Sequence, residues 1–163
     1  MANSVTFRAV PGLPFIEPGD DLAAIVIDAL KVAGPAPASG DVLVVAQKVV
    51  SKAEGRYVRL TDIDPSDRAR QLAAATGKDP RFVEVVLSES SDVVRHGPNV
   101  LIVVHRLGFV MANAGIDQSN IAHVGGEERV LLLPRDPDGA AAAAPRDFNY
   151  RPDADRHRGD PMG

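Results

Sequence analysis

The sequence predicts a domain of mixed α/β (α+β) class, in which a mixed sheet is flanked by helices. Two kinds of pattern indicate this class, because apolar residues recur at helical spacing in some segments and form strand-like runs in others. The 163 residues are enough for one domain with a buried core, and 45% of them are hydrophobic. We place this domain at residues 1–138 and an irregular, disordered tail at residues 139–163.

The first predicted helix occupies residues 18–34. Asp20 is suited to accept hydrogen bonds from the free amides at its start, and Gly34 is suited to end it. Its apolar residues recur three and four positions apart and therefore share one face: Leu22, Ile25, Val26, Ala29 and Leu30. A connection rich in Pro and Gly follows.

Two further helices are predicted at residues 62–77 and 78–90. In each, an Asp stands directly before a Pro, which is the preferred pair for an N-cap and a first turn. These are Asp64 in the first segment and Asp79 in the second, and Gly77 marks the end of the first. The second segment has one apolar face: Phe82, Val83, Val86 and Leu87.

Strands are predicted from runs of β-branched and other apolar residues. The segment DVLVVA, residues 41–46, is a continuous apolar run after its first residue, as in a strand buried on both faces, and the chain turns polar at Gln47. The other predicted strands are RYVRL at residues 56–60, two strands within residues 99–115 and RVLLLP at residues 129–134. The two strands within residues 99–115 are joined by a predicted tight turn from His105 to Gly108.

Composition excludes several classes of function. The net charge of -4 removes the usual electrostatic reason to expect nucleic acid or an anionic membrane surface. The absence of Cys excludes disulfides, thiolate metal sites and cysteine nucleophiles. The four His residues show no metal-ligand spacing, and we interpret them as structural. Because the sequence shows neither a signal segment nor an apolar run long enough for a bilayer, we expect a soluble cytoplasmic protein.

A first candidate site lies in the segment QKVVSKAEGR. Lys48 and Lys52 are an even number of residues apart, so in an extended segment both ammonium groups would lie on one side. Paired lysines of this kind are suited to hold phosphate oxygens, and Gly55 allows a close backbone approach. The alternative is a solvated sheet edge at which Lys discourages aggregation. The spacing alone favours this second interpretation.

A second candidate site lies in MANAGIDQSN, where small residues lead to Asp117 and Asn120. The carboxylate is suited to bind Mg²⁺ or Mn²⁺, and the amide to contact a base or ribose. The alternative is a structural turn, because Asp and Asn readily bond their own backbone. The turn around Gly12 and Leu13 adds exposed amides that suit an anion, although such a loop has no specificity of its own.

Five segments together resemble one family, the coenzyme F420-0:L-glutamate ligases or γ-glutamyl ligases. They are GLPFIEPGDDLA, DVLVVAQKVVSKAEGR, ATGKDPRFVEVVLSES, HRLGFVMANAGIDQSN and LLLPRDPD, in the family's order and with similar spacing. The resemblance covers about Val10 to Asp138 and is far more specific than any one motif.

The resemblance implies a GTP- and metal-dependent enzyme that adds L-glutamate to F420-0 by a γ-linked amide, through an acyl phosphate. It implies Mg²⁺ or Mn²⁺ as cofactor, K⁺ as a further cation, and a homodimer. It leaves the catalytic residues unassigned and implies Asp117 as metal ligand. The residues that it implies for GTP binding are Pro11, Gly12, Leu13, Pro14, Gln47, Lys48, Lys52 and Asn120.

One departure from the family pattern bears on activity. Family members continue after the Asp-Pro-Asp motif with a further half that supplies an Asp-Thr/Ser-x-Gly-Arg motif, more metal ligands and the rest of the nucleotide site. Residues 139–163 do not resemble that half. The alternative function is therefore a non-catalytic nucleotide-binding or dimerisation module, from a truncated or split ligase.

Overall fold

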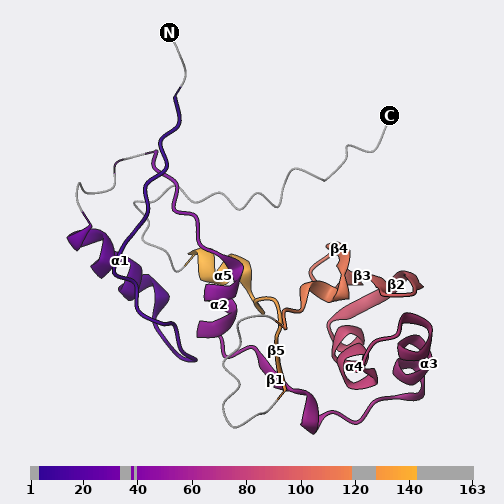
Figure 1. Ribbon diagram of the computed structural model, residues 1–163. Coiled ribbons are helices and arrows are strands. Elements are labelled where there is room, and N and C mark those ends of the chain that lie inside the picture. Colours follow the sequence, from indigo (N-terminus) through magenta and orange to yellow (C-terminus); the bar gives the residue numbers. More distant parts are fainter. Residues whose placement is uncertain (1–3, 34–37, 39, 119–127, 143–163) are drawn as a thin grey trace. The chain divides into compact units, whose positions relative to one another are not determined.

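The computed structural model describes residues 4–33, 38, 40–118 and 128–142 (Figure 1). The helices in this part are α1 (Leu22–Val32), α2 (Gln47–Ala53), α3 (Asp67–Thr76), α4 (Pro80–Ser88) and α5 (Pro137–Ala142), with short 3₁₀ turns η1 (Leu60–Asp62) and η2 (Asn113–Gly115). The strands are β1 (Tyr57–Arg59), β2 (Ser90–Gly97), β3 (Val100–His105), β4 (Val110–Ala112) and β5 (Arg129–Leu131). This content confirms the mixed α/β class.

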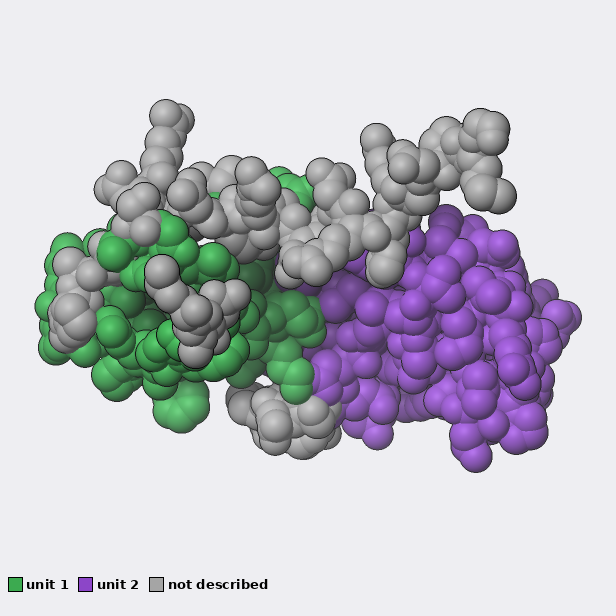
Figure 2. All heavy atoms as spheres, turned by 90° about the horizontal axis from the view of Figure 1, so that it is seen from above, with its two compact units in different colours: residues 1–54, 135–163 green, residues 55–134 purple. Residues whose placement is uncertain are grey.

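The chain forms two compact units, which Figure 2 shows in different colours. Unit 1 comprises residues 1–54 and 135–163, and unit 2 comprises residues 55–134. Unit 1 therefore holds α1, α2 and α5, whereas unit 2 holds all five strands with α3 and α4.

Unit 2 is built on two antiparallel sheets. One pairs β1 with β5, and the other has the order β2-β3-β4. The helices α3 and α4 pack against each other and against β2. Its buried apolar cluster comes from these helices, the strands and η2, and includes Phe82, Val83, Val86, Leu101, Val103, Ala114 and Val130. Three predicted members of the α4 apolar face, Phe82, Val83 and Val86, are thus confirmed as core.

The strand β2 was not among the predicted strands. Most residues of its sequence, SSDVVRHG, are polar. Apolar and polar residues therefore do not alternate in the way that predicts a strand. Tertiary pairing decides its conformation, because every paired residue of β2 lies opposite one of the strongly apolar β3. The hairpin turns at Asn99, whose φ of 61° lies in the left-handed region that Asn tolerates better than most residues.

Two predicted N-caps are wrong by one or two residues. Asp21 caps α1, where its carboxylate accepts from the Ala24 amide at 3.0 Å. Asp20 instead closes the preceding turn by accepting from the Glu17 amide at 2.8 Å. Ser66, not Asp64, caps α3. In both cases a second residue that is suited to cap the helix stands closer to the first helical turn. The predicted end of α1, at Gly34, lies outside the described residues.

Other boundaries are confirmed. Asp79 caps α4 with Pro80 in its first turn, and Gly77 ends α3 in the left-handed conformation with φ of 70°. The strand predicted in RYVRL is β1, and the one predicted in RVLLLP is β5. The tight turn between β3 and β4 is closed by the Gly108 amide, which donates to the His105 carbonyl at 2.7 Å.

The predicted strand at residues 41–46 is wrong. This segment has no regular secondary structure, and the helix α2 begins directly after it, at Gln47. A β-branched run forms a strand only when neighbouring strands accept its backbone hydrogen bonds, because β propensity depends on context. The strands that the structure describes in this chain all belong to unit 2 and pair with one another.

The chain after Pro134 enters α5, so residues 139–142, at the start of the segment expected to be irregular, are helical. The predicted disorder of the tail falls on residues that, from 143 onward, lie outside the described part. Among the described helices, none combines the length and the apolar character that a bilayer crossing needs.

Candidate functional site

The lysine pair lies on α2 in unit 1. The prediction placed Lys48 and Lys52 in an extended segment, and this is wrong, because both belong to a helix. Their separation of four residues nevertheless puts them on one face of the helix, one turn apart. The two side chains therefore still lie on one side of the segment, as expected, although the segment is a helix. Both residues are half-buried, whereas Gln47 at the helix start is exposed.

Two ammonium groups one turn apart repel each other, which costs an isolated helix about 0.2–0.5 kcal/mol. An anion bound between them would reverse this cost. The face that carries Lys48 and Lys52 is therefore suited to phosphate oxygens, in agreement with one of the two interpretations left open by the spacing.

The end of α2 holds two other segments of unit 1. The Gly19 amide donates to the Ala53 carbonyl at 2.8 Å, which fixes the turn before α1. The carboxylate of Glu54 accepts from the Arg135 amide at 2.5 Å and from the Asp136 amide at 3.4 Å. Three of the segments that carry the family resemblance thus meet at the last turn of α2.

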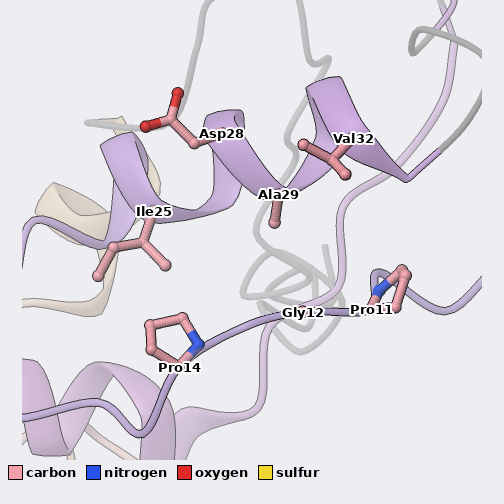
Figure 3. Close-up of a pocket in the computed structure, with 7 residues that line it drawn as sticks. All are labelled: Pro11, Gly12, Pro14, Ile25, Asp28, Ala29 and Val32. Carbon is pink, nitrogen blue, oxygen red and sulfur yellow. The ribbon is translucent and has the colours of Figure 1, made fainter.

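The loop of Pro11, Gly12, Leu13 and Pro14 also belongs to unit 1. It faces α1 across a hollow of about 370 Å³, lined by Pro11, Gly12, Pro14, Ile25, Asp28, Ala29 and Val32 (Figure 3). Leu13 is 45% exposed and is not among the lining residues. Gly12 has φ of 78°, a conformation that other residues rarely adopt.

The walls of this hollow are almost entirely apolar. Figure 3 shows Ile25 and Ala29 directed from α1 toward the loop, while the carboxylate of Asp28 points away from it. Asp28 is instead paired with Lys31 at 2.8 Å. A surface of proline rings and aliphatic groups suits a flat, uncharged ring and offers little to a phosphate.

Asp117 lies in unit 2, directly after an unusual turn. Asn113, Ala114 and Gly115 all have positive φ, of 51°, 53° and 66°, and the Ala114 side chain is fully buried. Asp117 then exchanges two backbone hydrogen bonds of 2.9 Å with Leu131, so its position is fixed by β5. The residue as a whole is half-buried, and its carboxylate oxygen Oδ2 is buried. The small residues of MANAGIDQSN thus form a left-handed turn that places Asp117 beside a strand.

Gly115 is required in this turn for two reasons. Its φ of 66° disfavours other residues, and a Cβ there would lie 3.0 Å from Met111 Sδ and 3.1 Å from two carbons of Leu133. The sequence indicated small residues that leave room for a ligand. The structure shows that at Gly115 the room is taken by the protein's own side chains.

The described residues fit a metal only in a limited way. In the described ranges, no three His, Asp or Glu side chains gather closely enough to hold an ion. Asp117 offers hard oxygen ligands, and Mg²⁺ commonly takes one or two carboxylates together with phosphate oxygens and water. The described residues therefore fit a metal shared with a nucleotide, and within the described ranges they do not form a cage of protein side chains alone.

A buried ionic cluster in unit 2 was missed by the sequence analysis. Glu89 Oε2 accepts from Arg56 Nη2 at 2.6 Å and from Arg106 Nε at 3.0 Å, and it lies 3.6 Å from His105 Nε2. Burial opposes ionisation of Glu89, but the hydrogen bonds from Arg106 and Arg56 outweigh it and hold its pKa below the ordinary value. Residues 33 positions apart in sequence meet here, which no local pattern could indicate.

His105 is 1% exposed, and its Nδ1 accepts from the Leu107 amide at 3.0 Å. Burial lowers the pKa of His105, and the nearby Arg106 and Arg56 act in the same direction, although Glu89 opposes them. Because Nδ1 accepts from the Leu107 amide, the neutral form of the ring carries its proton on Nε2. This agrees with the interpretation of His105 as a structural residue.

The predicted site residues are thus divided between the two units. Pro11, Gly12, Leu13, Pro14, Gln47, Lys48 and Lys52 belong to unit 1, and Asp117 belongs to unit 2. Asn120 lies outside the described residues. Unit 1 carries the cationic helix face and the apolar hollow, and unit 2 carries the carboxylate.

Comparison with known proteins identifies the class. The model of the F420-0:Gamma-glutamyl ligase family matches residues 12–153, most of the chain, so this protein belongs to that family.

Three relatives named coenzyme F420:L-glutamate ligase are also similar to most of this chain. The protein of Methanothermobacter thermautotrophicus is 44% identical over 137 residues, which are 84% of this chain and 53% of the relative. That of Methanopyrus kandleri is 48% identical over 126 residues, 77% of this chain and 46% of the relative. That of Archaeoglobus fulgidus is 46% identical over 132 residues, 81% of this chain and 49% of the relative. The chain thus spans about half the length of these relatives.

Proposed function

We propose that this chain carries the GTP- and metal-binding part of a ligase that joins L-glutamate to coenzyme F420-0 through a γ-linked amide. The observation that carries the proposal is the lysine pair on one face of α2, in a chain that belongs to the γ-glutamyl ligase family. The names of the relatives supply the glutamate and the F420 compound.

The chemistry explains why such a protein needs a triphosphate. A carboxylate is a poor electrophile, so an oxygen of the F420-0 carboxylate first attacks the γ-phosphorus of GTP and releases GDP. The amine of glutamate then attacks the acyl carbon, and phosphate leaves with the electron pair of the broken bond. A divalent ion, when bound, neutralises charge on the phosphates during the first step.

The residues of this chain take three roles in the proposal. Lys48 and Lys52 bind phosphate oxygens, because their common helix face concentrates positive charge. The hollow between α1 and the Pro11–Pro14 loop takes the nucleobase, whose flat ring matches its apolar walls. Asp117 binds Mg²⁺ or Mn²⁺ through a carboxylate whose backbone is fixed by Leu131.

The alternative proposal is a nucleotide-binding or dimerisation module without turnover of its own. The residues that the family model matches, 12–153, include Lys48, Lys52 and Asp117, which such a module would use. In this alternative, two copies of the chain would form the homodimer that the family resemblance implies. The two functions share nucleotide binding and differ in whether product forms.

Two measurements made together test the proposal. The chain is incubated with F420-0, L-glutamate, GTP and Mn²⁺, and glutamylated product is sought by mass spectrometry. Calorimetry with GTP, in the presence and absence of Mn²⁺, reports binding. Product together with metal-dependent binding supports the ligase. Binding without product favours the module, and the absence of both contradicts the two functions.

A further inference from the structure

The strand that fixes Asp117 belongs to a small sheet of unit 2. Leu131 of β5 exchanges two backbone hydrogen bonds of 2.9 Å with Asp117, and it is also the partner of Tyr57 in β1. Each of the two strands has three residues, and a two-stranded antiparallel sheet is at best marginally stable by itself. The position of Asp117 therefore depends on the contacts that hold this small sheet in place.

Arg56, the residue directly before β1, makes such contacts. Its carbonyl accepts from the Leu132 amide at 3.0 Å, and its Nε donates to the Leu133 carbonyl at 3.0 Å. From the same guanidinium, Nη2 donates to Glu89 Oε2 at 2.6 Å. A guanidinium is a rigid planar group, so its two donors hold the Leu133 carbonyl and the Glu89 carboxylate at a fixed separation.

Glu89 is a firm anchor because other parts of unit 2 fix it. It is 8% exposed and lies directly after α4, which contributes Phe82 and Val83 to the buried apolar cluster. Arg106 Nε donates to the same Oε2 atom at 3.0 Å, and the Arg106 amide donates to the Glu89 carbonyl at 2.9 Å. Arg56 therefore connects the small sheet to the buried core of unit 2.

Leu133 provides a second connection between Arg56 and Asp117. Two carbons of the Leu133 side chain lie 3.1 Å from the position that a Cβ of Gly115 would occupy. Gly115 is the last residue of η2, the left-handed turn that leads into Asp117. The residue whose carbonyl Arg56 holds thus packs against the turn before Asp117. Arg56 acts on Asp117 both through β5 and through this turn.

We propose that Arg56 is a positioning residue for Asp117: by fixing the chain after β5 against Glu89, it fixes the carboxylate to which the proposed function assigns Mg²⁺ or Mn²⁺. The Arg56 side chain is 10% exposed, so it acts through these hydrogen bonds and not by contact with a ligand. The inference rests on the proposed role of Asp117. Groups that orient a metal ligand commonly raise metal affinity by about 10–100-fold.

Arg56→Lys tests this role in the full chain. The lysine keeps a positive charge for Glu89, but its single nitrogen cannot replace the two donors that a guanidinium directs to Glu89 and Leu133. Arg106→Lys is the matched control, because Arg106 donates to the same Glu89 oxygen from the turn after β3. Both variants keep the charge beside Glu89, and Arg56→Lys also loses the hold on Leu133.

Amide hydrogen exchange without nucleotide or metal measures the effect on position. In Arg56→Lys, the amides of Asp117 and Leu131 are expected to exchange at least about tenfold faster than in the parent. The Val103 amide, in the central strand β3, is expected to keep its rate. In Arg106→Lys, the first two amides are expected to change no more than that of Val103. Equal acceleration of all three amides in Arg56→Lys, or none, would overturn the inference.

Calorimetry with GTP, in the presence and absence of Mn²⁺, measures the effect on the metal. The gain in GTP affinity that Mn²⁺ brings is expected to fall about tenfold in Arg56→Lys and to keep the parent value in Arg106→Lys. If Asp117→Asn loses this gain and Arg56→Lys keeps it, the inference is wrong and the proposed function stands. If Asp117→Asn also keeps the gain, or the parent shows none, the proposed role of Asp117 is wrong and the inference falls with it.

Discussion

Arg56 donates from Nη2 to Glu89 Oε2 across 2.6 Å, and about nine-tenths of each side chain is buried. The same guanidinium donates from Nε to the Leu133 carbonyl at 3.0 Å. Arg56 thus joins Glu89, the residue directly after α4, to Leu133, which lies two residues after the end of β5. One side chain fixes the positions of two elements that are distant in sequence.

Arg56→Ala is expected to destabilise unit 2 by about 3–5 kcal/mol, because it leaves Glu89 buried with one guanidinium fewer and frees the Leu133 carbonyl. Urea unfolding followed by circular dichroism measures the change. Arg70→Ala is the matched control, since the pair of Arg70 with Asp64 is exposed, and a loss below about 1 kcal/mol is expected there. Similar losses for the two variants would show that burial does not matter.

His105 makes unit 2 sensitive to mild acid. Its pKa in the folded state lies below the ordinary 6.5, so the unfolded state binds more protons as the pH falls through that value. The contribution of His105 is therefore complete above about pH 6.5 and is lost progressively toward the lower folded pKa. Unfolding free energy measured from pH 7.5 to 5 is expected to fall.

His105→Asn removes this titration while its side-chain oxygen can still accept from the Leu107 amide. The variant is expected to show a smaller pH slope in that range. A slope in His105→Asn equal to that of the parent would assign the acid sensitivity to other groups.

Gly115→Ala tests the turn before Asp117. The added Cβ meets Met111 and Leu133 at 3.0–3.1 Å in a left-handed conformation, so a loss of about 1–3 kcal/mol is expected in urea unfolding. Gly77→Ala separates the two causes, since φ there is 70° but nothing lies within 4 Å of the Cβ. It is expected to cost about 1 kcal/mol. A larger loss at Gly77 would show that crowding is unimportant at Gly115.

Lys52→Ala tests the cationic face of α2. Loss of one charge-assisted contact to phosphate is expected to weaken GTP binding about tenfold or more, measured by calorimetry. Lys78→Ala, at a half-buried lysine of unit 2, is expected to leave GTP affinity unchanged. An unchanged affinity in Lys52→Ala would favour the alternative in which these lysines only solubilise the surface.

Asp117→Asn tests the metal ligand. The amide keeps the size of the side chain and the backbone bridge to Leu131, so little loss of fold is expected. The dependence of GTP affinity on Mn²⁺ is expected to disappear, because an amide is a much weaker ligand for a hard cation. Asp64→Asn, at a carboxylate that is 98% exposed, is the control. If the GTP affinity of Asp117→Asn depends on Mn²⁺ as strongly as that of the parent, Asp117 is not the metal ligand.

The sequence predicted the elements whose signals are local. The Asp79-Pro80 start of α4, the Gly77 end of α3 and the turn after His105 were all correct, because each depends on the conformational preference of a few neighbouring residues. The caps at Asp20 and Asp64 failed for a related reason. Where two capping residues stand close together, the local pattern cannot choose between them.

The sequence by itself determined family membership and the mixed class, because motifs and apolar spacing are written along the chain. The roles of the candidate binding residues stay predictions from the same motifs. Tertiary structure alone decided that β2 is a strand while residues 41–46 are not, and that Arg56, Glu89 and His105 share one buried site. Strand pairing and ion pairing join residues far apart in sequence, so their free energy depends on partners that no local pattern specifies.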